Sequence, residues 1–187
     1  LAGVKRSGAM IYLITGGARS GKSSYAEQLA SMRAQVTYVA TATACDDEMA
    51  TRIQRHKMDR PAHWALVEQP FELSSVVNDS SSTLLIDCLT LYLTNWLCSE
   101  SRWPDYEQEK SRFLAALRDA SEVCQRHIFI VTNEVGSGIV PVGELSRRFA
   151  DEAGWLNQAV AAIADDVTLV VAGCPLAVKR NGVLLHG

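Results

Sequence analysis

The sequence has no excess of basic residues and no long apolar run. Its 187 residues carry 18 lysines and arginines against 21 aspartates and glutamates, which gives a formal net charge of −3 at pH 7. That balance gives no reason to expect a nucleic-acid partner. No apolar stretch approaches the roughly 20 residues of a membrane-spanning helix, and none follows the start as in a secretory signal. We therefore expect neither nucleic-acid binding nor a membrane span.

Cysteine is present but follows no recognisable pattern. The five cysteines are odd in number and scattered, and no two of them form a CxxC motif. This speaks against a disulfide framework and against a structural zinc site. Most of them fit the role of small buried apolar residues in a reducing compartment, so we expect a cytoplasmic protein.

Repeats, low-complexity tracts and long linkers are also lacking, and the length suits one domain with a substantial core. Residues 1–9, LAGVKRSGA, look like a tail derived from an expression vector, and Met10 is the expected natural start. We expect a single nucleotide-binding catalytic domain over residues 10–187.

Short apolar runs alternate with amphipathic segments along the chain, which predicts an α/β fold with a mostly parallel central sheet flanked by helices. The expected strands cover residues 10–15, 36–43, 64–68, 83–87, 128–132 and 167–172, and a hairpin over 176–185 turns at Asn181-Gly182. The expected helices cover residues 22–33, 46–58, 89–98, 104–126 and 144–164.

The two longest expected helices each carry an apolar stripe that should face the core. On the helix from Pro104 the stripe comprises Tyr106, Phe113, Leu114, Leu117, Ala120 and Cys124. On the helix over 144–164 it comprises Leu145, Phe149, Leu156, Val160 and Ile163. The intervening residues 133–141, NEVGSGIVP, have the composition of a functional loop.

The segment GGARSGKS (16–23) follows an expected strand, opens an expected helix and satisfies the pattern GxxxxGK[ST]. Its glycines let the backbone wrap closely and direct N–H groups at phosphate oxygens, and the helix adds its positive end. Lys22 can reach the β- and γ-phosphates, and the Ser23 hydroxyl is placed to hold Mg²⁺. These residues predict a phosphate-binding loop, or P-loop, for a nucleoside triphosphate.

Asp87 ends the apolar run LLI, where a P-loop protein usually keeps the acid that holds Mg²⁺. A strand-end aspartate could equally cap the helix that follows it. Ser23 and Asp87 are therefore candidate metal ligands, with the capping role of Asp87 left open.

His56 lies between two arginines on one predicted helix face, because Arg52, His56 and Arg60 are spaced at i, i+4 and i+8. Neighbouring positive charge disfavours the imidazolium form and keeps the ring neutral and nucleophilic. Such a ring could attack the α-phosphorus of a bound nucleotide and expel pyrophosphate. A basic helix face with a surface histidine would give the same spacing, so the spacing does not decide.

Together these residues resemble the bifunctional adenosylcobinamide kinase / adenosylcobinamide-phosphate guanylyltransferase family of cobalamin biosynthesis. The matching blocks span nearly all of the chain after Met10. They are GGARSGKS (16–23), YVATA (38–42), DDEMATRIQRHKMDRPAHW (46–64), LLIDCLTLYLTN (84–95), VTNEVGSGIVP (131–141), RRFADEAGWLNQAVA (147–161) and VVAGCPLAVK (170–179).

The resemblance implies two reactions. A nucleoside triphosphate, ATP or GTP, phosphorylates adenosylcobinamide, and GMP is then transferred from GTP through a guanylylated histidine to give adenosylcobinamide-GDP. The histidine of RHK, His56, inherits the covalent role, and Lys22 acts on the phosphates. The resemblance further implies a RecA-like core topology and a homotrimer, while the P-loop residues predict Mg²⁺ as cofactor.

Nucleotide contacts are carried over from the same resemblance. They fall on Gly16, Gly17, Ala18, Arg19, Ser20, Gly21, Lys22, Ser23, Ala40, Thr41, Ala42, Lys57, Met58, Asp59, Arg60, Glu68 and Asp87. Some relatives have Glu at the Asp87 position, which suggests that the carboxylate matters more than its length. Ala42 departs from the Ser of some relatives, which weakens the expectation for that side chain alone.

Three hypotheses follow. The chain is the bifunctional kinase and guanylyltransferase, or a P-loop small-molecule kinase in which His56 is structural, or a nucleotide-gated binding module without chemistry. Lys22 and Ser23 argue against the third, because both act on the terminal phosphates and the metal. His56 between its two arginines favours the first over the second.

Overall fold

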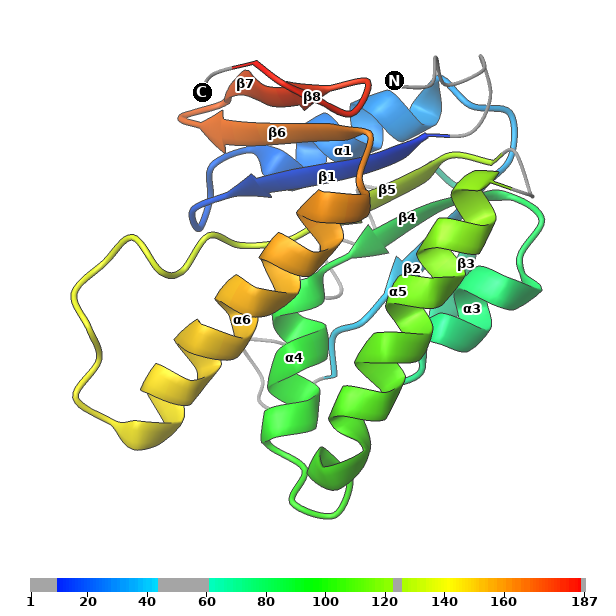
Figure 1. Ribbon diagram of the computed structural model, residues 1–187. Helices are drawn as coiled ribbons and strands as arrows, with labels where there is room; N and C mark the ends of the chain where they lie inside the picture. Colours follow the sequence, from blue (N-terminus) through cyan, green and yellow to red (C-terminus); the bar gives the residue numbers. More distant parts are fainter. Residues whose placement is uncertain (1–9, 44–60, 123–125, 186–187) are drawn as a thin grey trace.

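The computed structural model describes residues 10–43, 61–122 and 126–185. Within them the chain forms an eight-stranded sheet of order β3-β2-β4-β5-β1-β6-β7-β8 with helices on both faces (Figure 1). The strands are β1 (Ile11–Gly16), β2 (Val36–Ala40), β3 (Ala65–Glu68), β4 (Thr83–Asp87), β5 (Ile128–Val131), β6 (Asp166–Val171), β7 (Cys174–Arg180) and β8 (Val183–Leu184). The helices are α1 (Lys22–Ser31), α3 (Leu73–Asp79), α4 (Leu89–Leu97), α5 (Tyr106–Glu122), α6 (Glu144–Ile163) and the 3₁₀ helix Trp103–Asp105.

The strands β1 to β6 run parallel to one another, and in the described segments the β6–β7 and β7–β8 pairs are antiparallel. Helix α1 covers one face of the sheet, while α4, α5 and α6 lie on the other, with α3 packed against α5 (Figure 1). This confirms the predicted fold class of a mostly parallel sheet flanked by helices.

Two cores lie on the two faces of the sheet, and successive residues of β4 and β5 enter them in turn. On β4, Leu84 and Ile86 pack into the core under α3–α6, while Leu85 packs into the core under α1. On β5, Phe129 joins the α1 core between two residues of the other. Because helices cover both faces, the middle residues of β4 and β5 are apolar on both sides, which explains why these strands read as continuous apolar runs.

Where the chain is described, the boundaries of the predicted elements agree with the structure to within a few residues. Two other features differ from the prediction. Helix α3 lies in a stretch for which we predicted no element. Leu145 was wrongly predicted to face the core: it is 57% exposed and borders a cavity of about 260 Å³ with residues of α4. The first turn of α6 extends beyond the sheet (Figure 1). The apolar stripe of α6 is therefore longer than the core it covers, and Leu145 lies on the part that extends past that core.

Two tight turns close the antiparallel end of the sheet. Ala172-Gly173 joins β6 to β7 with φ of 50° and 80°, and Asn181-Gly182 joins β7 to β8 with φ of 49° and 80°. Positive φ at both central residues is typical of type I′ turns, whose twist matches that of a hairpin. The predicted hairpin with its Asn181-Gly182 turn is confirmed.

Two predicted features fall outside the described residues. One is the helix expected over 46–58, with His56 and its flanking arginines, and the other is Cys124, which we expected on the helix over 104–126. No helix in the described segments is both long enough and apolar enough to span a bilayer.

Candidate active site

The P-loop connects the carboxyl end of β1 to the amino end of α1. Gly16 must be glycine, because a Cβ there would lie 2.5 Å from the Val170 carbonyl oxygen and 2.6 Å from Ser20 Oγ. Gly21 has φ of 91°, a left-handed conformation that favours glycine, and a Cβ there would meet the Cα of Gly173 at 3.3 Å. Gly17 is exposed, and a Cβ there would meet nothing within 4 Å. The loop is thus pressed against the sheet at Gly16 and Gly21 and open at Gly17.

Lys22 is held at the centre of this loop. Its side chain is 8% exposed and its Nζ donates a hydrogen bond to the carbonyl oxygen of Gly17 at 3.2 Å. Gly21, the N-cap residue of α1, has no side chain that could occupy the first N–H groups of the helix. A helix start of this kind, combined with a buried lysine, is suited to bind phosphate oxygens.

The strand ends align into one row across the sheet. Register pairs Glu68 of β3 with Ala40 of β2, and Ala40 with Asp87 of β4. Asp87 then pairs with Val131 of β5, which pairs with Ile14 of β1. Ligands of open parallel sheets bind outside the carboxyl ends of the strands. With strands about 4.8 Å apart, Glu68 lies about 19 Å along the row from β1, at the far end of the candidate site.

Asp87 does not behave as a helix cap. Helix α4 begins at Leu89 with Cys88 in the N-cap position, and Asp87 Oδ2 instead accepts a hydrogen bond from the Tyr38 hydroxyl at 2.8 Å. Tyr38 thereby orients the half-buried carboxylate on the strand two places from the P-loop strand. This geometry argues against the capping role of Asp87, and its role as a metal ligand stays a prediction.

The donor set at this edge suits magnesium. Ser23 offers a hydroxyl and Asp87 a carboxylate, and Mg²⁺ prefers oxygen ligands, with one or two carboxylates supplemented by substrate phosphates. In the described segments no three His, Cys, Asp or Glu side chains converge into a complete metal cage. Any ion held here would therefore depend on the nucleotide for part of its coordination.

Thr41 links the ends of β2 and β4. It is fully buried, its hydroxyl donates to the Cys88 carbonyl oxygen at 2.8 Å, and it accepts from the Cys88 N–H at 2.9 Å. The Thr41 carbonyl oxygen accepts from Asn95 Nδ2 at 2.7 Å, and its N–H donates to Asp87. The side chain of Thr41 therefore makes its hydrogen bonds inside the protein. Of the three residues 40–42 that we expected to contact the nucleotide, Thr41 uses its side chain to hold the ends of β2 and β4 together.

The charges of Asp87 and Lys22 both act on Cys88. Burial is the largest cause that raises the pKa of the Cys88 thiol to about 11, and the Asp87 carboxylate raises it further, while Lys22 acts in the opposite direction. The thiol therefore stays protonated and apolar at neutral pH, as we expected for a buried cysteine. Cys98 and Cys174 are exposed, so among the described cysteines the prediction that most are buried is wrong.

A polar network that the sequence did not reveal fixes the chain after β5. The Asn133 N–H donates to Thr90 Oγ1 at 2.8 Å, and Asn157 Nδ2 donates to the Asn133 carbonyl oxygen at 3.1 Å. Thr132 Oγ1 donates to Asn157 Oδ1 at 2.8 Å. The next residue, Glu134, donates its N–H to the carbonyl oxygen of Gly16 at 3.1 Å. In the sequence, the only signal for this region was the composition of the loop after Thr132, which we interpreted as functional.

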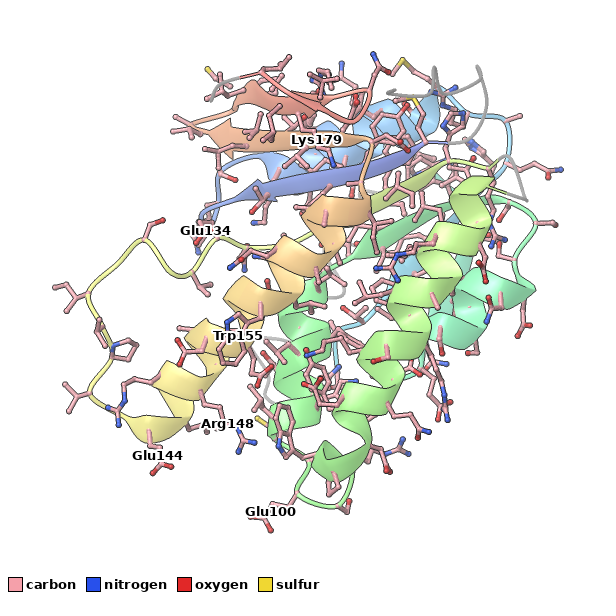
Figure 2. All side chains as sticks on the ribbon, in the orientation of Figure 1. Glu100, Glu134, Glu144, Arg148, Trp155 and Lys179 are labelled. Carbon is pink, nitrogen blue, oxygen red and sulfur yellow. The ribbon has the colours of Figure 1, made fainter. Side chains whose placement is uncertain are left out.

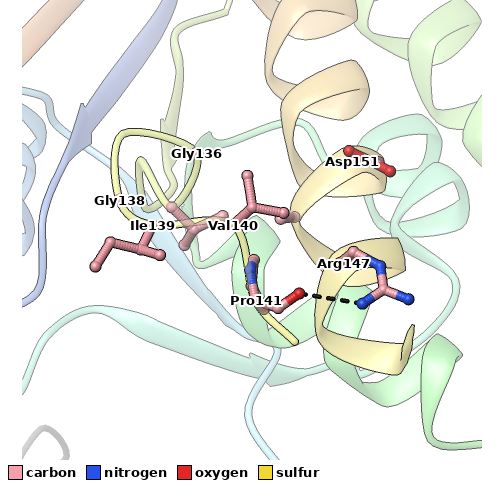
Figure 3. A pocket seen from close by; sticks show the side chains of 9 residues that line it. Gly136, Gly138, Ile139, Val140, Pro141, Arg147 and Asp151 are labelled. Carbon is pink, nitrogen blue, oxygen red and sulfur yellow. Dashed lines mark hydrogen bonds between the residues drawn. The ribbon is translucent and has the colours of Figure 1, made fainter. Parts of the chain in front are cut away.

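That loop runs away from the sheet and returns to α6 (Figure 1). Between loop and helix lies a cavity of about 270 Å³ whose polar wall is formed by Arg147 and Asp151 (Figure 3). Arg147 Nη1 donates to the Pro141 carbonyl oxygen at 3.2 Å and also to Val142. Ile139 and Val142 are 97% and 95% exposed. The predicted functional loop thus leads from the P-loop to an open, partly apolar surface.

The structure brings together the P-loop residues 16–23, the strand ends at 40–42 and Asp87, with Glu68 at the end of the row. The remaining predicted site residues, His56, Lys57, Met58, Asp59 and Arg60, lie outside the described residues. His127 directly precedes β5, at the amino ends of the strands and thus opposite the candidate site. Burial, and to a smaller extent the charge of Arg33, lower the pKa of His127.

A strand, a glycine-rich loop with a buried lysine and a helix start, set at the carboxyl edge of a parallel sheet, define a P-loop nucleotide-binding protein. Comparison with known proteins specifies the class further. Residues 12–178 match the family model described as cobinamide kinase / cobinamide phosphate guanyltransferase. The chain belongs to this family, which confirms the predicted resemblance and the predicted pair of enzyme activities.

Named relatives agree with this assignment. The chain is 48% identical over 172 residues to the bifunctional adenosylcobalamin biosynthesis protein CobP of Pseudomonas aeruginosa, covering 89% of this chain and 96% of the relative. It is 41% identical over 182 residues to the CobU protein of Escherichia coli and 43% identical over 181 residues to that of Salmonella typhimurium. Each of these alignments covers 91% of this chain and 100% of the relative.

Proposed function

We infer that this protein is a bifunctional enzyme of cobalamin biosynthesis that runs both of its reactions at one P-loop. It phosphorylates adenosylcobinamide with ATP or GTP and then transfers GMP from GTP to the product, giving adenosylcobinamide-GDP. The observation that carries the single-site inference is the one loop at 16–23, in which Lys22 is buried beside an uncapped helix start.

In the kinase step, the N–H groups of Gly17–Ser23 and the Lys22 ammonium hold the triphosphate and stabilise the charge that spreads over the transferred phosphoryl group. Ser23 and Asp87 would hold Mg²⁺, which when bound neutralises charge on the β- and γ-phosphates. Tyr38 keeps the Asp87 carboxylate turned toward this edge through its 2.8 Å hydrogen bond. No protein nucleophile is required for this reaction.

In the guanylyl transfer, His56 attacks the α-phosphorus of GTP, pyrophosphate leaves, and the phosphate of the corrinoid then displaces histidine from the guanylyl group. The flanking arginines, Arg52 and Arg60, keep the imidazole neutral by charge repulsion and attract the phosphates. Contacts from Lys57, Met58, Asp59 and Glu68 bind the nucleotide away from the triphosphate. Ala40–Ala42 contribute backbone and small side chains, because Thr41 uses its hydroxyl on Cys88.

The same proposal includes the setting of the enzyme. Residues 10–187 act as one catalytic domain, and the protein works as a homotrimer in the cytoplasm. The trimer rests on the family resemblance, and the cytoplasmic location rests on cysteines that are odd in number and form no CxxC motif. Sedimentation of the purified protein tests the trimer directly.

Label from α-³²P-GTP tests the covalent route. We expect acid-labile, base-stable label on the wild-type protein, as a phosphoramidate requires, and none on His56→Ala, which should keep kinase activity. His63→Ala is the matched control, because His63 is exposed and close in sequence and should leave labelling intact. A His56→Ala variant that still makes adenosylcobinamide-GDP from the phosphate at a near-normal rate would show direct transfer.

Lys22→Ala tests the shared site. Contacts to transferring phosphoryl groups contribute several kcal/mol to the transition state, so both activities should fall by a factor of about 10² or more. Either activity within about tenfold of wild type would refute a single P-loop site, since one power of ten corresponds to only about 1.4 kcal/mol.

A further inference from the structure

Glu134 stands at the rim of the P-loop although nothing in the P-loop motif includes it. Strand β5 lies between β1 and β4, and the chain continues from it through Thr132 and Asn133 to Glu134. The N–H of Glu134 donates to the carbonyl oxygen of Gly16 at 3.1 Å, so its backbone is one hydrogen bond from the first residue of the loop. Figure 2 shows Glu134 beside the turn that follows β1.

The backbone that carries Glu134 is fixed, while its carboxylate faces solvent. Thr132 donates its N–H to Ile14 at 3.0 Å, and Asn133 is hydrogen-bonded on both its N–H and its carbonyl oxygen. Glu134 itself is exposed, and its Oε1 accepts from the Gly136 N–H at 3.0 Å, which sets the direction of the side chain. Val135 and Gly136 then line the cavity beside α6.

In the part of the chain that the structure describes, no ion pair uses the negative charge of Glu134. A neutral glutamine oxygen would accept the same hydrogen bond from Gly136. A carboxylate beside a triphosphate is moreover repelled by it, because both are negatively charged. A fixed, solvent-facing carboxylate at the rim of a phosphate site is therefore better explained by chemistry than by stability.

We propose that Glu134 is the general base of the kinase step. The acceptor hydroxyl oxygen of the corrinoid forms a bond to the γ-phosphorus, the bond between that phosphorus and the β,γ-bridging oxygen breaks, and the nucleoside diphosphate leaves. The hydroxyl proton passes to the carboxylate of Glu134 and then to solvent. This role rests on the proposed P-loop site, since Glu134 can act only on a phosphate bound there.

The proposal separates the two reactions of the enzyme. An alcohol must lose its proton as it attacks, and a positioned base then contributes typically 10²–10⁴-fold. In the second reaction the nucleophile is a phosphate monoester, whose second pKa of about 6 leaves it already ionised at neutral pH. Glu134 should therefore matter for phosphorylation and not for guanylyl transfer.

Glu134→Gln tests this in the full-length protein, because it keeps the acceptor for Gly136 and removes the base. We expect kcat for phosphorylation of cobinamide to fall about 10²-fold or more, with KM for the nucleotide unchanged. Labelling of the protein by α-³²P-GTP and transfer to cobinamide phosphate should stay near wild-type rates.

Glu144→Gln is the control, because Glu144 is an exposed glutamate at the start of α6, well away from β1 (Figure 2). It should leave both reactions unchanged. Phosphorylation by Glu134→Gln at near-wild-type kcat, or equal loss of both reactions, would overturn the assignment. If Lys22→Ala also kept phosphorylation, the P-loop site itself would be wrong, whereas loss in Lys22→Ala alone would reject only Glu134.

Discussion

Replacing Thr41, the residue directly after β2, with valine should destabilise the protein more than the loss of the Thr37 hydroxyl within β2. The change keeps the shape of the side chain and removes its hydrogen-bonding oxygen. Thr41 is fully buried, and both of its hydroxyl contacts, at 2.8 and 2.9 Å, go to the backbone of Cys88. The Cys88 carbonyl oxygen also accepts from the Tyr92 N–H at 3.1 Å, so it keeps one partner. The Cys88 N–H loses the partner that Thr41 provides.

The magnitude follows from these contacts. A buried N–H left without a partner costs about 1–3 kcal/mol, and a lost hydrogen bond at a carbonyl that keeps another costs about 0.5–1.5 kcal/mol. We expect the free energy of unfolding to fall by about 2–4 kcal/mol. For a chain of this size each kcal/mol lowers Tm by about 2–4 °C, which predicts a drop of roughly 4–16 °C.

Urea unfolding followed by circular dichroism measures the change, and Thr37→Val provides the comparison. Thr37 lies on β2, four residues before Thr41, and is half-buried, and its hydroxyl pairs with Ser82 Oγ at 2.7 Å. Ser82 also lies 3.0 Å from Ser80 Oγ, so the loss leaves no group without a partner. Its cost should stay below about 1 kcal/mol. A Thr41→Val variant no less stable than Thr37→Val would refute the reasoning.

Three further outcomes are expected. Gly16→Ala should weaken nucleotide binding and cost about 1–3 kcal/mol of stability, because its Cβ would lie 2.5 Å from a backbone oxygen. Gly17→Ala should fold as the wild type does, because its Cβ would meet nothing within 4 Å. Equal melting temperatures of the two variants would contradict this expectation. Asp87→Asn should reduce metal-dependent turnover more than nucleotide binding, measured by kinetics and by equilibrium titration, and equal losses would argue against a metal ligand. Cys88 should resist thiol reagents at pH 8 in the folded protein while the exposed Cys98 reacts, as peptide mapping would show, because burial raises the Cys88 pKa to about 11.

The sequence could predict those parts of the candidate site whose signals lie close together in the chain. The P-loop and Asp87 could be located because strand, loop and helix signals adjoin one another within a few positions. The contacts of Thr41 with Cys88 and of Glu134 with Gly16 could not, because each joins segments whose proximity depends on strand order, and periodicity does not encode strand order.

Helix α3 was missed for a related reason. Its sequence, LSSVVND, contains serine and valine, which are weak helix formers. Its first turn is capped from α5, where Glu109 Oε1 and Oε2 accept from the Ser74 N–H at 2.9 Å and from Ser74 Oγ at 2.8 Å. The group that stabilises the helix start stands 35 residues further along, so local propensity could not predict it.

The turn between β6 and β7 has a consequence for when the nucleotide site forms. Gly173 donates its N–H to the Ser20 carbonyl oxygen at 2.8 Å, and its Cα limits the space at Gly21. One wall of the P-loop therefore comes from residues that a ribosome adds about 150 positions later, and synthesis proceeds at about 5–20 residues per second. During the intervening seconds the motif exists as sequence without its finished shape. Nucleotide binding therefore reports a sheet completed as far as β7, and a nascent chain that ends before the turn should not compete for cellular GTP.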